Sequence, residues 1–434
     1  MLTRIHVKGY KSLNDVEVKL PNLAVLFGPN ASGKSNFLDC LQLLSKLATS
    51  RTLKAAFDPP YRGKPLESFT FGRDGLKGAL EQHRLSFSIE VDVRLSDAVA
   101  NTVNRQVREL RGPDGDKNGE AAKPVEAVRE RDLRYRIVVE MDPRTGLLRV
   151  AEEYLAALNV HGEPTGRRQP FLSEKEGRLR LRQEGQAHPT YYELGVDHTV
   201  LSLPHYPPYY PHLVAMRTEL ENWFFFYFEP RERMRAATPV KEVRHIGAMG
   251  EDLASFLNTL KVLEPRQFEG VERALRTIMP NIESIGLEIS KLGEVELTLR
   301  EGGIEFPARI LSEGTLRILG LLALSGAREP PSLIGFEEPE NGIHPRRIQL
   351  IAELFKTRAS FGDTQYIVTT HSPLIPDLVT DHQRFICRKK DGTTRIDPYE
   401  GWGPLAAKGT IDAAFDDADE TTVSDRIRRG DFDA

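Results

Sequence analysis

The sequence predicts an α/β fold in which helices flank a parallel or mixed sheet. Three segments predict it: a glycine-rich turn between an apolar run and a helix-like stretch at 23–47, and two later apolar runs, 333–336 and 365–370, that end in polar residues. Continuous apolar runs are typical of parallel strands, because both faces of such a sheet are buried. Ligands bind beside the carboxyl ends of such strands. We therefore expect the three polar ends to converge on one site.

The glycine-rich turn has the spacing G-x-x-x-x-G-K-S, from Gly28 to Ser35. Its glycines let backbone N–H groups form an anion nest, and the following helix adds the positive end of its dipole. Lys34 can then reach the β- and γ-phosphates, and Ser35 can bind Mg²⁺. The residues expected to contact the nucleotide are Gly28, Asn30, Ala31, Ser32, Gly33, Lys34, Ser35 and Asn36. The sequence therefore predicts a site for a nucleoside triphosphate and Mg²⁺. A chance match in a surface turn would not account for the flanking strand and helix.

Composition narrows the class of protein. The chain has 434 residues, a net charge of −4, and no apolar run long enough to cross a membrane. Because the net charge is negative, the chain as a whole is not a polycation that would coat nucleic acid. Only Cys40 and Cys387 are present, which excludes a disulfide framework and fits a reducing cytoplasm. We therefore expect a cytoplasmic protein without a membrane partner.

Composition along the chain predicts four parts. They are an N-terminal lobe at 1–95 with the glycine-rich turn, an insertion at 96–230, a C-terminal lobe at 231–400 and an acidic tail at 401–434. The insertion begins with a charged segment, 101–132, that we expect to be a flexible loop, and continues with β-segments over 134–196. The aromatic run 223–228 is expected to be a buried strand, with a base-stacking platform as the alternative. Further strands are expected at 3–7, 16–20, 83–93, 285–289 and 294–299, and helices at 252–260 and 267–279.

The apolar run 333–336 ends in two adjacent carboxylates, Glu337 and Glu338. Hydrolysis of a triphosphate needs one group that holds Mg²⁺ and another that orients or deprotonates the attacking water. We assign Glu337 to the metal, together with Ser35, and Glu338 to the water. A solvated acid pair that caps a helix is the alternative, and it fits poorly after an apolar run.

Two further segments complete the predicted site. His371 follows the second apolar run and can donate a hydrogen bond to a γ-phosphate, so Glu338, His371 and Lys34 are the expected catalytic residues. Alone, a histidine after a strand would more often be structural. Ser312 is a natural N-cap for a helix that reaches 324, and Ser312 and Gly314 offer a hydroxyl and free N–H donors to an anion.

These four elements, in this order, resemble the ABC-class ATPases of the SMC/RecF-like and OLD-like branch. The resemblance rests on the glycine-rich turn, Leu-Ser-Glu-Gly at 311–314, Glu-Glu-Pro-Glu at 337–340 and Thr-His-Ser-Pro at 370–373, and it covers 1–50 and 231–378. It implies an ABC-type ATPase head with a β-rich middle insertion, in which two heads enclose two ATP molecules. By this resemblance Ser312 and Gly314 contact the ATP of the opposite subunit, and 341–344 is the loop that crosses the dimer interface.

The sequence departs from the family pattern in several respects. The signature is Leu-Ser-Glu-Gly where transporters have Leu-Ser-Gly-Gly-Gln, and no convincing glutamine loop lies between the helix after the turn and the insertion. The metal-binding acid is usually aspartate, whereas Glu337 is one methylene longer. Few residues follow 378, and no Asp-x-Asp follows a strand there, so we expect no Toprim nuclease domain. The resemblance implies a homodimer or higher homo-oligomer that acts in phage defence or DNA repair, with a separate effector such as a nuclease.

Three alternative functions stay open. One is a repair ATPase that binds DNA directly, with arginines of the insertion contacting phosphates. The second is a transporter ATPase, which the signature sequence disfavours. The third is a scaffold that binds ATP without hydrolysing it. The arginines of the first alternative are Arg105, Arg108, Arg111, Arg129, Arg131, Arg134 and Arg136.

Overall fold

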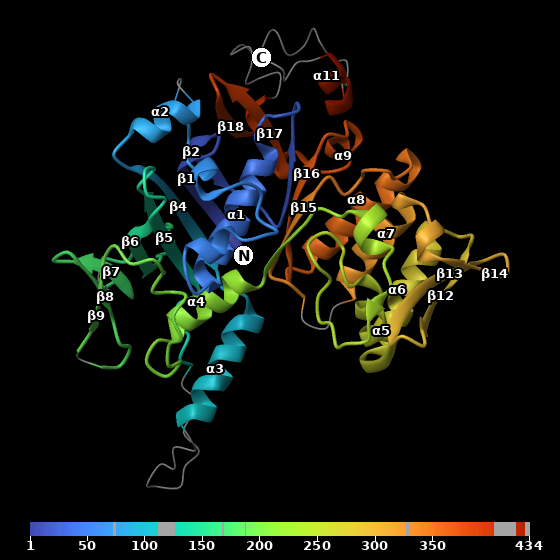
Figure 1. Cartoon of the computed structure of the whole chain (residues 1–434), viewed down its shortest axis with the longest axis horizontal. Coiled ribbons are helices and arrows are strands. Elements are labelled where there is room, and N and C mark those ends of the chain that lie inside the picture. Colours follow the sequence, from blue (N-terminus) through green and yellow to red (C-terminus); the bar gives the residue numbers. More distant parts are fainter. Residues whose placement is uncertain are drawn as a thin grey trace. The chain divides into compact units, whose positions relative to one another are not determined.

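The computed structural model describes residues 1–72, 75–111, 126–166, 169–186, 188–326, 330–402 and 422–429. These residues form two compact units, each made of several chain segments (Figure 1). Unit 1 comprises Met1–Pro21, Ala31–Trp223 and Lys389–Ile396. Unit 2 comprises Asn22–Asn30, Phe224–Arg388 and Asp397–Ala434. The chain therefore passes between the units inside the glycine-rich turn.

Unit 1 is built on an antiparallel sheet with the strand order β2-β1-β4-β5-β6-β7-β8-β9. Buried and partly exposed residues alternate strictly along β5, which is the pattern of a sheet with one face on the core. The strands predicted over 134–196 extend the sheet of β1 and β4 through the pairing of β4 with β5. The bounds are β1 Leu2–Tyr10, β2 Leu13–Lys19, β4 Leu85–Arg94, β5 Asp132–Met141, β6 Leu148–Ala157, β7 Leu172–Lys175, β8 Arg178–Leu181 and β9 Thr190–Glu193.

The helices of unit 1 include one that the sequence did not predict. α4 packs against both α1 and α3. The expectation of a flexible loop from residue 101 is wrong up to Arg111, because α3 buries Val99, Val103 and Val107 at the four-residue spacing of one helix face. The glycine-rich part of that loop, 112–119, lies outside the described residues. The bounds are α1 Lys34–Thr49, α2 Gly75–Glu81, α3 Asp97–Arg111 and α4 Pro211–Glu221.

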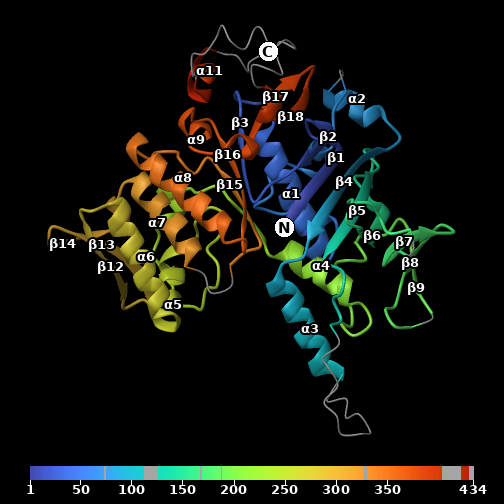
Figure 2. The same ribbon diagram turned by 180° about the vertical axis from the view of Figure 1, so that it is seen from behind.

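Unit 2 contains the predicted parallel strands. β15 pairs with β16, β16 with β3, and β3 with β17, all in parallel. The full strand order is β10-β15-β16-β3-β17-β18, and helices α8 and α9 pack against its central strands (Figure 2). The α/β prediction is therefore confirmed. The bounds are β3 Leu23–Phe27, β10 Trp223–Phe226, β15 Leu333–Glu337, β16 Gln365–Thr370, β17 Arg384–Lys390 and β18 Thr393–Pro398.

A second, antiparallel sheet of unit 2 has the order β11-β13-β12, with β14 paired to β13. Helices α5, α6 and α7 pack on one another, and α5 and α6 also contact this sheet. Their apolar side chains join those of β3, β15 and β16 in one hydrophobic core. The bounds are α5 Leu253–Leu263, α6 Pro265–Ile278, α7 Glu313–Ser325, α8 Pro345–Ser360, α9 Leu374–Asp377, α11 Val423–Arg429, β11 Thr238–Pro239, β12 Ile282–Ile289, β13 Glu294–Glu301 and β14 Ile304–Pro307.

The aromatic run at 223–228 is a buried strand, as predicted, and its alternative as an exposed stacking platform is wrong. Phe226 and Phe228 both contact Phe336 of β15, with ring centroids 5.6 and 5.0 Å apart. Most of the predicted acidic tail lies outside the described residues. Within the described part of the chain, no helix has the length and apolar character needed to cross a membrane.

Candidate nucleotide site

Three strands of unit 2 end at the same level of the parallel sheet. Thr369 of β16 lies opposite Glu337, the last residue of β15, and Thr370 lies opposite Phe27, the last residue of β3. The glycine-rich turn, the carboxylate pair and the histidine therefore leave the sheet at one edge. This is the carboxyl edge, at which open α/β sheets bind ligands.

Gly28 begins the turn in unit 2, against the backbone of β17. It has a φ of 148°, and a Cβ at this position would lie 2.1 Å from the carbonyl oxygen of Cys387. No residue with a side chain fits there without a movement of the backbone. The first glycine of the motif is therefore required by close packing as well as by conformation.

Gly33 ends the turn in unit 1 and is the N-cap of α1, with a φ of 101°. A Cβ there would lie 1.9 Å from Oγ1 of Thr394 and 2.9 Å from Oγ of Ser12. Thr394 also donates a hydrogen bond of 2.8 Å to the carbonyl oxygen of Ser32. Asn36, a predicted contact residue, donates one of 2.7 Å to Ser12. The backbone of the turn is thus fixed by two residues far from it in sequence.

Ser12 and Thr394 are supports of the turn that sequence reasoning missed. Ser12 lies within 1–50, which the family resemblance covers, and had no other signal. Thr394 carried no signal, because its role depends on the packing of β18 against the turn. Lys34 is buried at the start of α1, and its Nζ lies 3.4 Å from Oγ of Ser32.

Glu338 is held in a strained conformation by two donors. Its φ is 48°, a left-handed value that non-glycine residues rarely adopt. Nε2 of His371 lies 2.6 Å from one carboxylate oxygen, and Nδ2 of Asn341 donates a hydrogen bond of 2.6 Å to the other. Such strain persists only where surrounding contacts enforce it, and it is concentrated at functional sites. The carboxylate is therefore fixed in orientation, and His371 is its direct neighbour, as their shared site predicted.

Glu340 follows β15 and connects it by hydrogen bonds to the end of β16. One of its oxygens accepts a hydrogen bond from the hydroxyl of Thr370 and another, of 3.2 Å, from the N–H of Ser372. Its second oxygen, Oε2, is buried without a hydrogen-bond partner among the described residues. Burial raises the pKa of Glu340 above its ordinary value.

Glu340→Gln is expected to stabilise the protein at neutral pH by about 1 kcal/mol, because it replaces a buried charged carboxylate with a neutral amide. Since the folded-state pKa is raised, the parent has its full stability below the ordinary pKa of 4.5 and loses stability as the pH rises through the folded-state value. The gain of the variant should therefore disappear toward acid pH. Urea denaturation across this pH range measures it, and a gain that is equal at all pH values would contradict the explanation.

Glu337 is the last residue of β15 and is partly buried. The two predicted Mg²⁺ ligands, Glu337 of unit 2 and Ser35 of unit 1, each offer the hard oxygen donor that Mg²⁺ prefers, and their meeting stays a prediction. Among the described residues no group of three or more His, Cys, Asp or Glu side chains could hold a metal ion by itself. The Mg²⁺ site proposed below accordingly includes the nucleotide.

The signature segment begins α7 as predicted. Ser312 is the N-cap, and its hydroxyl accepts a hydrogen bond of 3.1 Å from the N–H of Thr315. Gly314 packs on the segment 341–344 of the same chain, since a Cβ at Gly314 would lie 2.4 Å from the carbonyl oxygen of Gly342. The signature segment therefore lies against the segment that carries Asn341, whose side chain donates to Glu338.

Ser312→Ala is expected to lower the free energy of unfolding by about 1 kcal/mol, because the N-cap hydrogen bond is lost. Ser312→Asn keeps a capping acceptor and should retain most of that stability. Urea denaturation of the two variants beside the parent gives the measurement. Equal losses in both would show that the cap contributes nothing.

Within unit 2 the structure brings Gly28, Glu337, Glu338 and His371 to one edge of the sheet. Lys34, Ser35 and Asn36 belong to unit 1, and their meeting with the carboxylates stays a prediction. So does the contact of Ser312 and Gly314 with the ATP of another subunit.

Two family comparisons match different parts of the chain. Residues 1–114 match the family described as AAA ATPase domain, and residues 211–377 match the one described as AAA domain, putative AbiEii toxin, Type IV TA system. A curated relative, the retron Vc95 probable ATPase of Vibrio cholerae serotype O1 biovar El Tor, is 26% identical over 180 residues, or 38% of this chain. The matched region spans about a third of that relative, 34% of its length.

Comparison with solved structures identifies the fold. The crystal structure of an SmcHead bound to the C-winged helix domain of ScpA aligns with a TM-score of 0.51 and 14% identity, over 91% of this chain and 97% of that one. The SMC head domain from Thermotoga maritima aligns with a TM-score of 0.41 and 15% identity, over 92% and 98% of the two chains, which is too low a score to support an argument. The first alignment confirms the head-like α/β architecture.

Proposed function

We propose that this chain, which matches AAA ATPase families and has the fold of an SMC head, is an ATPase of the SMC/RecF-like, ABC class that hydrolyses ATP at the carboxyl edge of the unit 2 sheet. The observation that carries the proposal is the placement of Glu338. It follows a buried strand, has a strained backbone, and is hydrogen-bonded to His371 and Asn341. A carboxylate fixed in this way is suited to accept a proton from water and to direct that water at the γ-phosphate.

The glycine-rich turn supplies the binding half of the proposed site. Its backbone and Lys34 would hold the β- and γ-phosphates, and His371 would approach the γ-phosphate while it keeps Glu338 oriented. Mg²⁺, held by Ser35 and Glu337 with the phosphates, would neutralise charge that develops on the phosphate oxygens. Phosphate release by the purified chain tests the proposal. A chain that binds ATP but releases no phosphate, with or without DNA or a partner protein, would instead support an ATP-binding scaffold.

We further propose that ATP joins two heads. In the family resemblance, Ser312 and Gly314 of one head contact the ATP of the other. The packing of Gly314 on Gly342 supports this, because the contact links that signature to the segment that carries Asn341 and so to Glu338. Light scattering of the hydrolysis-deficient Glu338→Gln variant should then give twice the monomer mass with ATP and the monomer mass without it. A monomer at saturating ATP would contradict head closure.

The biological process that we propose is antiphage defence together with a separate effector protein. A named relative from a retron system supports it, although the matched region spans only about a third of that protein. Plaque assays on cells that express this chain with its neighbouring gene would test it. Protection that is lost in Glu338→Gln supports defence, whereas sensitivity to DNA damage without any effect on plaques would support repair.

A further inference from the structure

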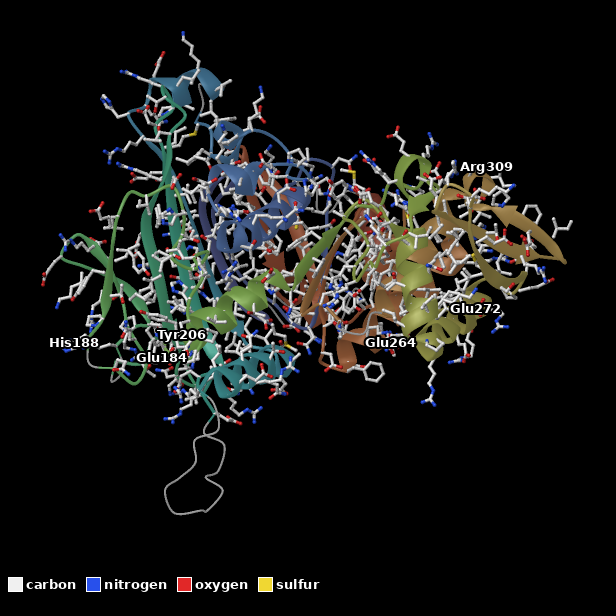
Figure 3. All side chains as sticks on the ribbon, turned by 60° about the horizontal axis from the view of Figure 1, so that its bottom comes forward. Glu184, His188, Tyr206, Glu264, Glu272 and Arg309 are labelled. Carbon is white, nitrogen blue, oxygen red and sulfur yellow. The ribbon has the colours of Figure 1, made fainter. Side chains whose placement is uncertain are left out.

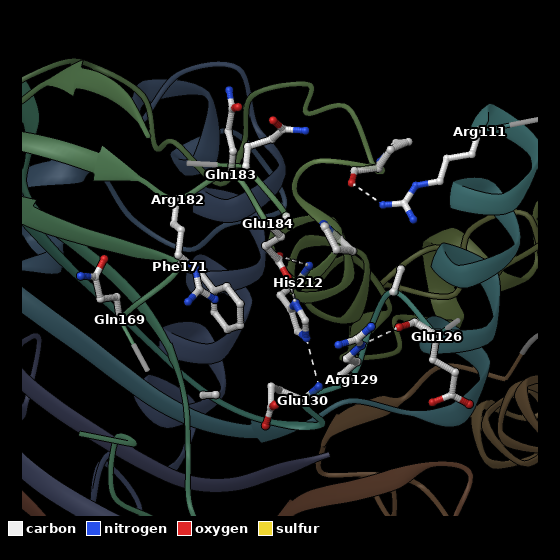
Figure 4. A pocket seen from close by; sticks show the side chains of 16 residues that line it. Arg111, Glu126, Arg129, Glu130, Gln169, Phe171, Arg182, Gln183, Glu184 and His212 are labelled. Carbon is white, nitrogen blue, oxygen red and sulfur yellow. Dashed lines mark hydrogen bonds and ion pairs between the residues drawn. The ribbon is translucent and has the colours of Figure 1, made fainter. Parts of the chain in front are cut away.

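We propose that unit 1 binds a single-stranded nucleic acid at a cavity far along the chain from the glycine-rich turn. The cavity has a volume of about 820 Å³, within the range of roughly 300–1,000 Å³ typical of ligand sites. It is lined by the end of α3, the segment 126–130, the residues around β7 and β8, and the start of α4 (Figure 4).

The floor of the cavity is a rigid stack of planar groups. The rings of Phe171 and His212 are stacked with centroids 4.4 Å apart, and the guanidinium of Arg182 lies 4.5 Å from the Phe171 centroid. His212 is buried, its Nδ1 donates to Glu184 at 2.6 Å, and its Nε2 accepts the N–H of Glu130 at 3.0 Å. Because both ring nitrogens of His212 are hydrogen-bonded, the histidine has a structural role: it holds the ring of Phe171 in place and has no free nitrogen for catalysis.

The charges at the rim favour an anionic ligand. Arg111 donates to the carbonyl oxygen of Pro208 at 3.1 Å, and Arg129 donates to that of Glu126 at 3.2 Å. Within the described ranges neither guanidinium pairs with a carboxylate, and both side chains are exposed. Glu184 is occupied by His212, whose N–H and Nδ1 use both of its oxygens. The lining has three arginines and three glutamates, and of these Arg111 and Arg129 are the exposed cations at the rim.

Two tyrosines beside the cavity have largely exposed side chains. Tyr206 and Tyr209 flank the lining residue Pro208, are 44% and 41% exposed, and form a T-shaped pair at 5.3 Å. The hydroxyl of Tyr206 reaches the carbonyl oxygen of Leu110 at the end of α3, and Figure 3 shows Tyr206 beside Glu184 on the same surface. Exposed aromatic faces next to arginines are the usual platform for unstacked bases.

α3 continues the basic surface away from the cavity. Arg105, Arg108 and Arg111 are exposed on α3 at three-residue spacing, and the exposed Glu109 lies among them. A strand whose phosphates follow this helix would bring bases to the two tyrosines and one base into the cavity. A duplex keeps its bases stacked inside, so it can use the arginines but not the tyrosines. This is why we infer a single strand.

Binding of a labelled oligothymidylate to the nucleotide-free whole chain tests the inference. An oligomer of about 20 nucleotides exceeds the ~4–16 nucleotides that a single site contacts. We expect Tyr206→Ala and the charge reversal Arg111→Glu each to weaken binding about tenfold or more, by loss of stacking and of a phosphate contact respectively. The matched controls Phe361→Ala and Arg309→Ala, both exposed residues of unit 2, should bind as the parent does.

Three outcomes would overturn the inference. The first is no binding at about 50 mM salt, where phosphate contacts are stronger than at higher salt. The second is that a duplex binds equally well and Tyr206→Ala has no effect. The third is that polyglutamate competes equally well, which would show a site that recognises only charge. Circular dichroism of each variant confirms that it is folded. ATP hydrolysis without nucleic acid is measured on the same variants and should not change. The two proposals can therefore fail independently.

Discussion

Glu338→Gln is expected to reduce ATP hydrolysis by about 100- to 10,000-fold, the range for loss of a positioned general base, while ATP still binds. The amide cannot accept the proton of the attacking water. Its size matches that of the carboxylate, so the segment between β15 and Asn341 should keep its conformation. Steady-state phosphate release gives the rate, and equilibrium binding of a fluorescent ATP analogue shows that the nucleotide site is intact.

Glu353→Gln is the matched control, because Glu353 is exposed on α8 and, among the described residues, pairs with Lys356 of its own helix. It should hydrolyse ATP at the parental rate. If Glu338→Gln retained more than about a tenth of that rate, Glu338 would not be the base, since even a modest general base contributes more. A loss of ATP binding together with hydrolysis would indicate a structural role.

Gly33→Ala is expected to weaken ATP binding by at least about 100-fold. The added Cβ would lie 1.9 Å from Oγ1 of Thr394, and the φ of 101° is one that alanine rarely adopts. Strain of this kind costs about 1–3 kcal/mol before the steric contact is counted. The turn should therefore change conformation, and its N–H groups should no longer converge on the phosphates. Equilibrium binding of the same ATP analogue gives the affinity.

Two variants separate the causes of this loss. Gly166→Ala is the control, because no atom of the described residues lies within 4 Å of an added Cβ at Gly166, and it should bind ATP normally. Thr394→Ala combined with Gly33→Ala removes the nearest atom but keeps the backbone strain, so it should restore only part of the affinity. Parental binding by Gly33→Ala would show that the turn tolerates a side chain and that its glycine is not required.

The sequence was sufficient to predict the elements that depend on a residue's own type and its near neighbours, such as buried strands and helix caps. The apolar runs at 23–27, 333–336 and 365–370 form strands, because runs of four to six buried residues are too short for a typical helix, and the strands are parallel as expected. Ser312 caps α7 because a hydroxyl at that position satisfies a free N–H. The prediction of a loop at 101–111 was wrong. The many arginines of this segment suggested a solvated loop, and the valines that recur every fourth residue and mark the buried face of a helix were overlooked.

Tertiary structure alone decided which distant residues complete these local features. Thr394 and Ser12 fix the turn, and His371 fixes Glu338, through contacts that depend on how strands pair and not on any spacing in the chain. The cavity of unit 1 likewise collects residues from six separate stretches between Arg111 and His212. The local propensity and expected burial of a residue depend on its own type and its sequence neighbours. A contact between side chains remote in sequence forms only when the chain has folded.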